Sequence, residues 1–486
     1  MYTVLKSIVS LCLILSCICG SYAQSRSGRH KADFEILTGA LLTTHPNLYR
    51  STPKAKFNEV LDSLRETMND ELSAVQFFRA ASRVFSMIKE GHSRVSPSRE
   101  LIAEMQDKAL FPFDVWLLDD RLVVRATRDS SYEDMVSSEI TSINGRPVND
   151  IIQCLVGLAG SSSGRDNHQG LIQSLSLYNN FAQAYYYFVD TTNTFQLGYQ
   201  KRGETESQIM QVRGVAGQIK DDDYLKLPAE REAPVTTEIN IKENYALLKV
   251  TTFAWWTGKY SIKEYKKVFK EFFKKVSDHG LEHLIIDVRD NRGGEELLGV
   301  DILTYLIPYA FTPYEYIQTS SLEYSSLKSL PEFEGDTKFN TRDYVENESG
   351  FQKKDDPILK TFDPKAKYAF RGQVYVLGNG RSWSAASTFL SWTKTHKAGI
   401  YVGQEGGGAF TTVDGRQMVK FTLPYSGLRV SYPIWSMKLN TSNGSPHSGP
   451  IPDVEIQKTP AQLLNGTDTE IEYVLRQIKA STQINP

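Results

Sequence analysis

The sequence predicts an α/β protein with a helical N-terminal region, a β-rich middle region and an α/β C-terminal region. Apolar residues recur at helical spacing between about residues 29 and 100. Short β-branched and aromatic runs separated by turn residues fill residues 110–213. After residue 236, strongly apolar runs alternate with amphipathic helical stretches, which is typical of a buried parallel sheet covered by helices.

Length, net charge and the absence of certain motifs limit the classes of function that the chain can have. The 486 residues are enough for two to four domains. The net charge is −2 and no long run of one sign occurs, so we expect no nucleic-acid partner. The chain has no His-Glu-x-x-His, P-loop or dinucleotide-binding pattern, and we therefore expect no metal and no cofactor.

Residues 1–23 resemble a signal peptide. Lys6 supplies a positive start, Ile8–Ile18 is an apolar run, and Ser21–Ala23 is a small-x-small cleavage site. The apolar run is short for a membrane span. We therefore predict a protein exported to the periplasm or secreted.

The cysteines fit export without disulfides. Lipidation of Cys17 is the less favoured alternative to cleavage before Gln24. Cleavage would remove three of the four cysteines and leave Cys154 as the single thiol. No intramolecular disulfide is then possible, and Cys154 lies in an apolar stretch that favours a core position.

Residues 24–105 are predicted to form an N-terminal helical domain. Ser73 and Gln76 form a capping box that starts one of its helices. Gly91 is predicted to end that helix in the left-handed conformation, and His92 follows at once.

Residues 106–215 are predicted to form a β-rich domain. Phe113–Leu117 and Leu122–Val124 predict a hairpin around Asp119–Asp120, and Ile140–Val148 predicts a strand, a turn and a second strand. The aromatic cluster Tyr185–Phe188 either packs in a core or lines a groove, and core packing is favoured.

Residues 236–460 are predicted to form the α/β core. Leu284–Val288 and Val374–Leu377 read as buried strands, each followed by a loop with glycines. Residues 312–367 are polar with little periodicity and predict a long insertion over the active face, of the kind that often forms a lid or a substrate-selecting loop. Residues 461–486 form a final helix that Asp468 is expected to cap.

Ser384 follows the second of these strands at the predicted start of a helix. Unpaired N–H groups and the helix dipole stabilise negative charge at such a place, so it suits a nucleophile. The alternative is that Ser382 or Ser384 merely caps the helix.

Three motifs together resemble the C-terminal processing peptidases, or tail-specific proteases, and their tricorn-core relatives. They are DVRDNRGG, SWSAAS and VGQEGGG, in that order. The resemblance covers most of the mature chain and implies a serine peptidase with Ser384 as nucleophile. The backbone N–H of Ala385 and one from Gly293 or Gly294 would form the oxyanion hole. It also implies a crotonase/ClpP-like core of ββα units and a PDZ-like domain at residues 106–215.

The resemblance is closer to the tricorn-type branch, which uses a histidine base. The other branch uses a lysine, and Ala409 stands where that lysine is expected. His92, in Glu-Gly-His-Ser, matches the histidine, whereas His45 suits a structural role better. The family's supporting serine falls on Gly91 and its late glutamate near Pro446, so the sequence does not name a partner for His92.

The resulting prediction is an exported serine endopeptidase that forms an acyl-enzyme on Ser384, with His92 as general base and a peptide or protein as substrate. A catalytically silent peptide-binding protein and an esterase are the alternatives. Cleavage specificity, oligomeric state and peptide binding by the PDZ-like domain stay open.

Overall fold

The computed structural model describes residues 28–484 apart from residues 70, 119–120, 159–171, 174, 177–179, 217–232, 259 and 442–443. The predicted signal peptide lies outside these residues, as do the hairpin turn at 119–120 and residues 217–232 between the predicted domains at 106–215 and 236–460. In the described part of the chain, no helix has the length and apolar character needed to span a bilayer.

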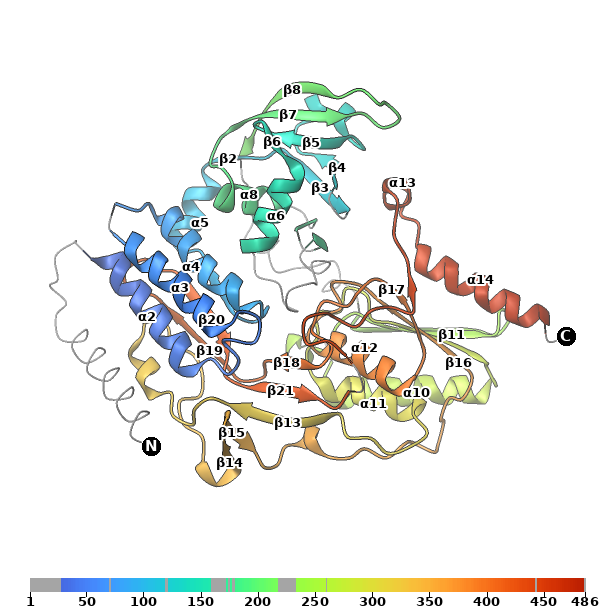
Figure 1. The fold of residues 1–486 in the computed structure, drawn as a ribbon. Helices are drawn as coiled ribbons and strands as arrows, with labels where there is room; N and C mark the ends of the chain where they lie inside the picture. The colour runs from blue at the N-terminus through green and yellow to red at the C-terminus, as the bar shows by residue number, and fades with distance from the viewer. Residues whose placement is uncertain are drawn as a thin grey trace.

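The N-terminal helices pack beside one another, as Figure 1 shows in blue. They are α2 (Arg29–Thr44), α3 (Lys54–Thr67), α4 (Ala74–Ile88) and α5 (Arg99–Gln106). The predicted capping box of Ser73 and Gln76 is present at the start of α4. The prediction that Gly91 ends this helix is wrong, because Lys89 takes the left-handed cap position with φ 51°. The chain therefore leaves α4 two residues earlier.

The middle region is an antiparallel sheet with two helices, drawn above the rest in Figure 1. Its helices are α6 (Val148–Leu158) and α8 (Asn180–Phe188). Its main strands are β3 (Phe113–Leu118), β4 (Arg121–Thr127), β5 (Glu139–Ile143), β6 (Arg146–Pro147), β7 (Thr194–Gln200) and β8 (Gln208–Arg213), and β2 (Ala109–Leu110) pairs separately with β9 (Val215–Ala216). The predicted hairpin is β3–β4. Tyr185, Tyr186 and Tyr187 are buried, which confirms core packing for the aromatic cluster.

The C-terminal core is a six-stranded sheet in the order β10-β11-β12-β16-β17-β22. Its strands are β10 (Val235–Asn240), β11 (Tyr245–Val250), β12 (His283–Asp287), β16 (Gln373–Gly378), β17 (Ile400–Gly403) and β22 (Val454–Glu455). All neighbouring pairs are parallel except β10–β11. The helices of this region are α10 (Ile262–Asp278), α11 (Glu296–Leu306), α12 (Ala385–His396), α13 (Pro460–Leu464) and α14 (Thr469–Ile484). This arrangement makes the chain a mixed α/β protein.

A second sheet of the core has the order β14-β15-β13-β21-β18. It contains β13 (Tyr314–Thr319), β14 (Tyr344–Asn347), β15 (Gly350–Lys353), β18 (Thr412–Asp414) and β21 (Ser436–Leu439). Three of these strands, β13, β14 and β15, lie within the predicted insertion at 312–367. β13 buries Tyr314 and Ile317 and pairs with β21 more than a hundred residues later, a pairing that local periodicity does not reveal.

The N-terminal helices are joined to the core by a third, three-stranded sheet. β1 (Arg94–Ser96) follows His92 and pairs antiparallel with β20 (Arg429–Pro433), which also pairs with β19 (Met418–Thr422). Figure 1 shows β19 and β20 running against the N-terminal helices. This sheet brings His92 to the core although the two are far apart in sequence.

Candidate active site

The two predicted loops lie side by side because their strands are neighbours. β12 and β16 are adjacent and parallel, and Asp287 is in register with Leu377. The N–H of Val288 donates to the carbonyl of Leu377 just beyond the strands. The carboxyl ends of parallel strands are where ligands bind in open α/β sheets.

Polar contacts join the loop after β12 to the loop after β16. The N–H of Asp290 donates to Asn379 Oδ1 (3.1 Å), and Asn379 Nδ2 donates back to Asp290 Oδ1 (3.0 Å). The N–H of Trp383 donates to the carbonyl of Asn291 (2.9 Å). These bonds hold the two loops in one fixed arrangement.

Ser384 occupies the N-cap position of α12 with φ 52° and ψ −126°. A positive φ is unfavourable for a residue with a Cβ, and such strain concentrates at functional sites. The Ser384 hydroxyl makes no capping bond. The Ser382 hydroxyl is buried and donates to the carbonyl of Val288 (2.7 Å). Neither serine therefore caps the helix with its side chain.

Gly293 lies directly against the predicted nucleophile. A Cβ on Gly293, where φ is 93°, would come within 2.8 Å of both Ser384 Cβ and the nitrogen of Ala385. The N–H of Gly293 donates to Asn291 Oδ1 (2.8 Å). Gly294, with φ 135°, packs against the backbone of Phe253. Ala385 opens α12, where N–H groups have no partner within the helix.

His92 and Ser384 line the same pocket. The imidazole of His92 stacks on Trp383 with ring centroids 4.1 Å apart and an interplanar angle of 29°. Position 415 also approaches the ring, since a Cβ on Gly415 would lie 3.8 Å from His92 Nε2. The other residues lining the pocket are Arg50, Glu90, Ser387, Thr388, Gly408, Ala409, Thr412, Val413 and Asp414.

Glu90 is the partner of His92 that the sequence does not name. Its Oε1 lies 2.7 Å from His92 Nδ1 and also accepts the backbone N–H of His92 (2.9 Å). The carboxyl is 3% exposed. Burial raises the pKa of Glu90, but the charge and hydrogen bonds of His92 outweigh it and bring this pKa down to about 2. Glu90 is therefore an ionised, buried acceptor for Nδ1.

The signal for Glu90 in the sequence is a Glu-x-His spacing directly after a helix. A carboxylate two residues before a histidine reaches Nδ1 only if the chain turns back between them. The left-handed Lys89 and the bond from the N–H of Ser93 to the carbonyl of Glu90 make that turn.

The structure also places the other residues that the sequence analysis singles out. Ala409 lines it, and among the described lining residues none is a lysine. Pro446 is exposed. His45 is buried and its Nε2 lies 2.9 Å from Ser93 Oγ, which agrees with the predicted structural role. In the part of the chain that the structure describes, no cluster of three or more His, Cys, Asp or Glu residues is placed to hold a metal ion.

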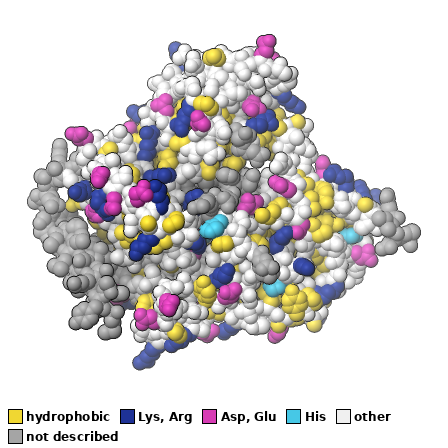
Figure 2. Space-filling model, viewed as in Figure 1, with side chains coloured by type: hydrophobic (Ala, Val, Ile, Leu, Met, Phe, Trp, Pro, Cys, Tyr) yellow, Lys and Arg dark blue, Asp and Glu magenta, His cyan; other side chains and the backbone are white. Residues whose placement is uncertain are grey.

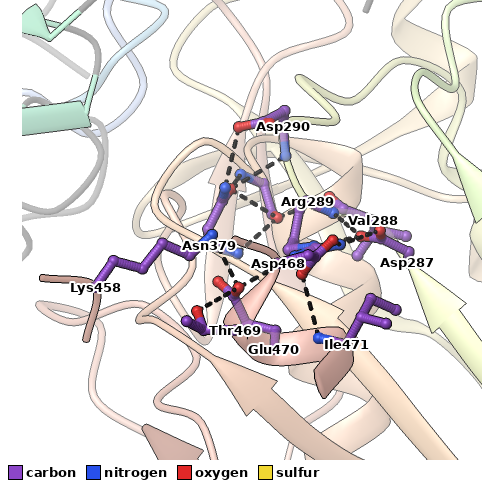
Figure 3. A network of polar contacts seen from close by, with 11 residues as sticks. Asp287, Val288, Arg289, Asp290, Asn379, Lys458, Asp468, Thr469, Glu470 and Ile471 are labelled. Carbon is purple, nitrogen blue, oxygen red and sulfur yellow. Dashed lines mark hydrogen bonds and ion pairs between the residues drawn. The ribbon is translucent and has the colours of Figure 1, made fainter. Parts of the chain in front are cut away.

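Arg289 anchors the loop after β12 to the C-terminal helix (Figure 3). Its guanidinium contacts Asp287 (2.7 Å), Asp468 (2.6 Å) and Glu470 (3.2 Å). Lys458 contacts Glu470 as well (2.9 Å). The N–H of Ile471 donates to Asp468 Oδ1, so Asp468 caps α14 as predicted.

The surface around these elements carries mixed charge. On the face drawn in Figure 2, lysine and arginine side chains are interspersed with aspartate and glutamate over all three regions. Such a surface does not produce a strong electrostatic potential of one sign.

Comparison with protein families decides the class of this site. Residues 244–456 match the model of peptidase family S41. The matched residues contain the three motifs DVRDNRGG, SWSAAS and VGQEGGG. This match supports the class of serine-type peptidases, which are hydrolases.

Solved structures extend the likeness beyond this domain. Mature CPAF complexed with lactacystin is 14% identical, with a TM-score of 0.61 over 94% of this chain and 98% of that chain. Mature CPAF is also 14% identical, with a TM-score of 0.59 over 91% and 98%. These likenesses show that almost the whole chain shares the fold. No curated protein sequence matches the chain.

Proposed function

We propose that this protein is a serine endopeptidase in which Ser384 is the nucleophile and His92 the general base. The observation that carries the proposal is that both side chains line one pocket, while His92 Nδ1 is held by the buried carboxylate of Glu90. A serine hydroxyl needs such a base because it is a weak nucleophile at neutral pH.

The chemistry follows from the tautomer of His92. Glu90 Oε1 accepts a hydrogen bond from the Nδ1–H of His92. Because the proton of the neutral ring is then on Nδ1, the lone pair on Nε2 is free to accept a proton. Ser384 Oγ attacks the carbonyl carbon of the scissile peptide as its proton passes to His92 Nε2. The carbon–nitrogen bond then breaks, and His92 gives this proton to the leaving amine. Water hydrolyses the acyl-enzyme by the same steps in reverse.

The oxyanion would be held by backbone N–H groups. Ala385 is the first residue of α12, so its N–H points out of the helix at its positive end. The Gly293–Gly294 loop, pressed against Ser384, would supply the second donor. Donors fixed in advance act on the transition state without reorganisation.

Labelling with a fluorophosphonate probe, alongside peptide cleavage, tests this proposal. We expect the wild-type protein to react at Ser384, and the Ser384→Ala and His92→Ala variants to lose both labelling and cleavage. Peptide cleavage by Ser384→Ala at the wild-type rate would overturn the nucleophile. Labelling that survives in His92→Ala would overturn the base. Peptide affinity without labelling would favour the catalytically silent alternative, and cleavage of esters alone would favour an esterase.

Two further parts of the proposal concern the rest of the chain. We propose export, on the signal-peptide pattern of residues 1–23, which a mature N-terminus at Gln24 would support. We also propose that residues 106–215 are PDZ-like, since their antiparallel sheet and two helices resemble that architecture. Binding of peptides with a free carboxyl terminus to this region would support the second point.

A further inference from the structure

Glu90 is held by a second layer of side chains, which Ser93 and His45 form behind it. Its Oε2 accepts both the N–H of Ser93 (2.8 Å) and the hydroxyl of Ser93 (2.9 Å). Ser93 is 4% exposed, so these bonds are shielded from water. The two oxygens of Glu90 thus accept four hydrogen bonds, two from His92 and two from Ser93.

His45 extends this layer by one more residue. Its Nδ1 accepts the N–H of Asn47 (3.2 Å), so in the neutral ring the proton is on Nε2. Nε2 lies 2.9 Å from Ser93 Oγ and therefore donates to it. Burial lowers the pKa of His45 to about 4, so the ring is neutral at physiological pH. Every hydrogen-bond direction from His45 to His92 is then determined.

We propose that His45 and Ser93 are positioning residues for the general base: through Glu90 they fix the tautomer and the orientation of His92. The chain of donors runs from His45 Nε2 to Ser93 Oγ and on to Glu90 Oε2, while Glu90 Oε1 accepts from His92 Nδ1. This inference rests on the proposed function, because it assigns a role in setting up that base.

The layer is built from two segments that are separate in sequence. His45 follows α2, and Ser93 lies between α4 and β1. The charged groups around it are Arg50, Arg94 and Asp414, besides Glu90 and His92. Arg50 pairs with Asp414 (2.8 Å), so the charges of these two residues compensate each other.

Ser93→Ala is the decisive variant. It removes one donor to Glu90 and leaves the Nε2–H of His45 without an acceptor. We expect kcat to fall about tenfold with KM little changed, because orientation of the base acts on the chemical step. The acid limb of the pH–rate profile should move to lower pH, because a Glu90 carboxylate that turns away from His92 stabilises the protonated imidazole less. Ser93→Thr keeps the hydroxyl and should restore most of the rate.

Two more variants separate positioning from stability. His45→Phe removes the donor to Ser93 and should lower kcat in the same direction, while His45→Gln retains an amide donor and should be milder. Ser98→Ala is the matched control, since Ser98 is a similarly buried serine whose hydroxyl caps α5. It should reduce stability without moving the acid limb.

A spectroscopic readout keeps the inference separate from the activity itself. In protein labelled with 15N-histidine, the His92 signals should report the Nδ1-protonated tautomer, and Ser93→Ala should yield a mixture. A mixture in an inactive protein would support the positioning layer and overturn only the proposed function. An active protein whose tautomer, kcat and acid limb are unchanged in Ser93→Ala would overturn the inference, whatever happens to its melting temperature.

Discussion

At the scale of single residues, Gly293 is where backbone geometry and the proposed chemistry meet most closely. Its φ of 93° and its approach to Ser384 both exclude a side chain. We predict that Gly293→Ala lowers kcat/KM at least a hundredfold, because a Cβ would displace Ser384 and the N–H of Ala385. Peptide cleavage by the folded variant, verified by circular dichroism, measures the effect.

Gly203→Ala is the control for the strain of a positive φ. Gly203 has φ 84°, but nothing lies within 4 Å of where its Cβ would be. Both variants incur the backbone cost of about 1–2 kcal/mol, and only Gly293→Ala should lose activity. Equal losses in the two variants would contradict the assigned role of this loop.

His45 makes stability depend on pH in a predictable direction. Its pKa is lowered by burial to about 4 from an ordinary value of 6.5. The unfolded chain therefore binds the proton first, and this contribution to stability is complete above pH 6.5 and is lost as pH falls toward 4. We predict a slope of up to roughly 1.4 kcal/mol per pH unit from this group.

Urea unfolding between pH 4 and 7 checks this prediction. The His45→Gln variant should show a shallower loss of stability than the wild type within that window. His279→Gln, at an exposed position, should retain the wild-type slope. A wild-type slope in His45→Gln would mean that His45 is not buried in the neutral form.

Residues of the candidate site that stand in a sequence motif can be predicted from the sequence alone. Ser384 and the Gly293–Gly294 loop stand in motifs that also imply their surroundings. Glu90 could not be predicted in this way, since its carboxylate meets His92 only through the turn that Lys89 makes in the left-handed conformation. Ser93 and His45 depend in addition on the packing of two separate segments.

At the scale of secondary-structure elements, α14 is tied to the active-site loop by buried charge. Asp287 and Glu470 are 3% and 2% exposed, and Arg289 contacts both. We predict that Arg289→Met lowers the free energy of unfolding by about 3 kcal/mol, because it leaves the buried carboxylate of Asp287 without its cation. Loosening of the loop should also reduce kcat. Urea unfolding and steady-state kinetics measure the two effects.

Lys479→Ala on the same helix is the matched control for Arg289→Met. Lys479 pairs with Glu243 at 4.0 Å, and their side chains are 66% and 37% exposed to solvent. An exposed pair contributes little, so we expect a change below about 0.5 kcal/mol. A similar loss of stability in both variants would show that α14 is not held through Arg289.

The sequence predicts some secondary-structure elements better than others, and the reason is physical. The capping boxes at Ser73 and Ser261 are local hydrogen-bond patterns, and both are present. Strand β13 is stabilised by pairing with β21, whose residues come about a hundred positions later, and β15 and then β14 add to its other edge. Pairing over that distance leaves no periodic signature in a polar segment.

At the scale of the whole molecule, the proposed base and nucleophile belong to separate parts of the chain. His92 follows the N-terminal helices, and Ser384 begins α12 in the core. The β1–β20 pairing and the buried contact between Thr44 Oγ1 and the Tyr432 hydroxyl (2.7 Å) join these parts. Activity is therefore expected to depend on this junction as well as on the two side chains.

An ion pair between Arg50 and Asp414 also crosses the junction. Arg50 Nη1 lies 2.8 Å from Asp414 Oδ2, and the Asp414 side chain is fully buried. Asn47 Nδ2 also donates to Asp414 Oδ1 (3.2 Å). We predict that Asp414→Asn lowers the free energy of unfolding by about 3 kcal/mol, because the variant leaves the Arg50 charge unpaired while nearly preserving shape.

The same variant should also lower kcat, by about tenfold at a temperature where the protein is fully folded, because the junction joins the segment that carries His92 to the core that carries Ser384. Steady-state kinetics at 15 °C and urea unfolding separate the two effects. Glu59→Gln removes an exposed ion pair with Lys56 on the N-terminal helices and should change neither. An unchanged kcat in a destabilised Asp414→Asn protein would mean that the junction supports the fold but does not position the base.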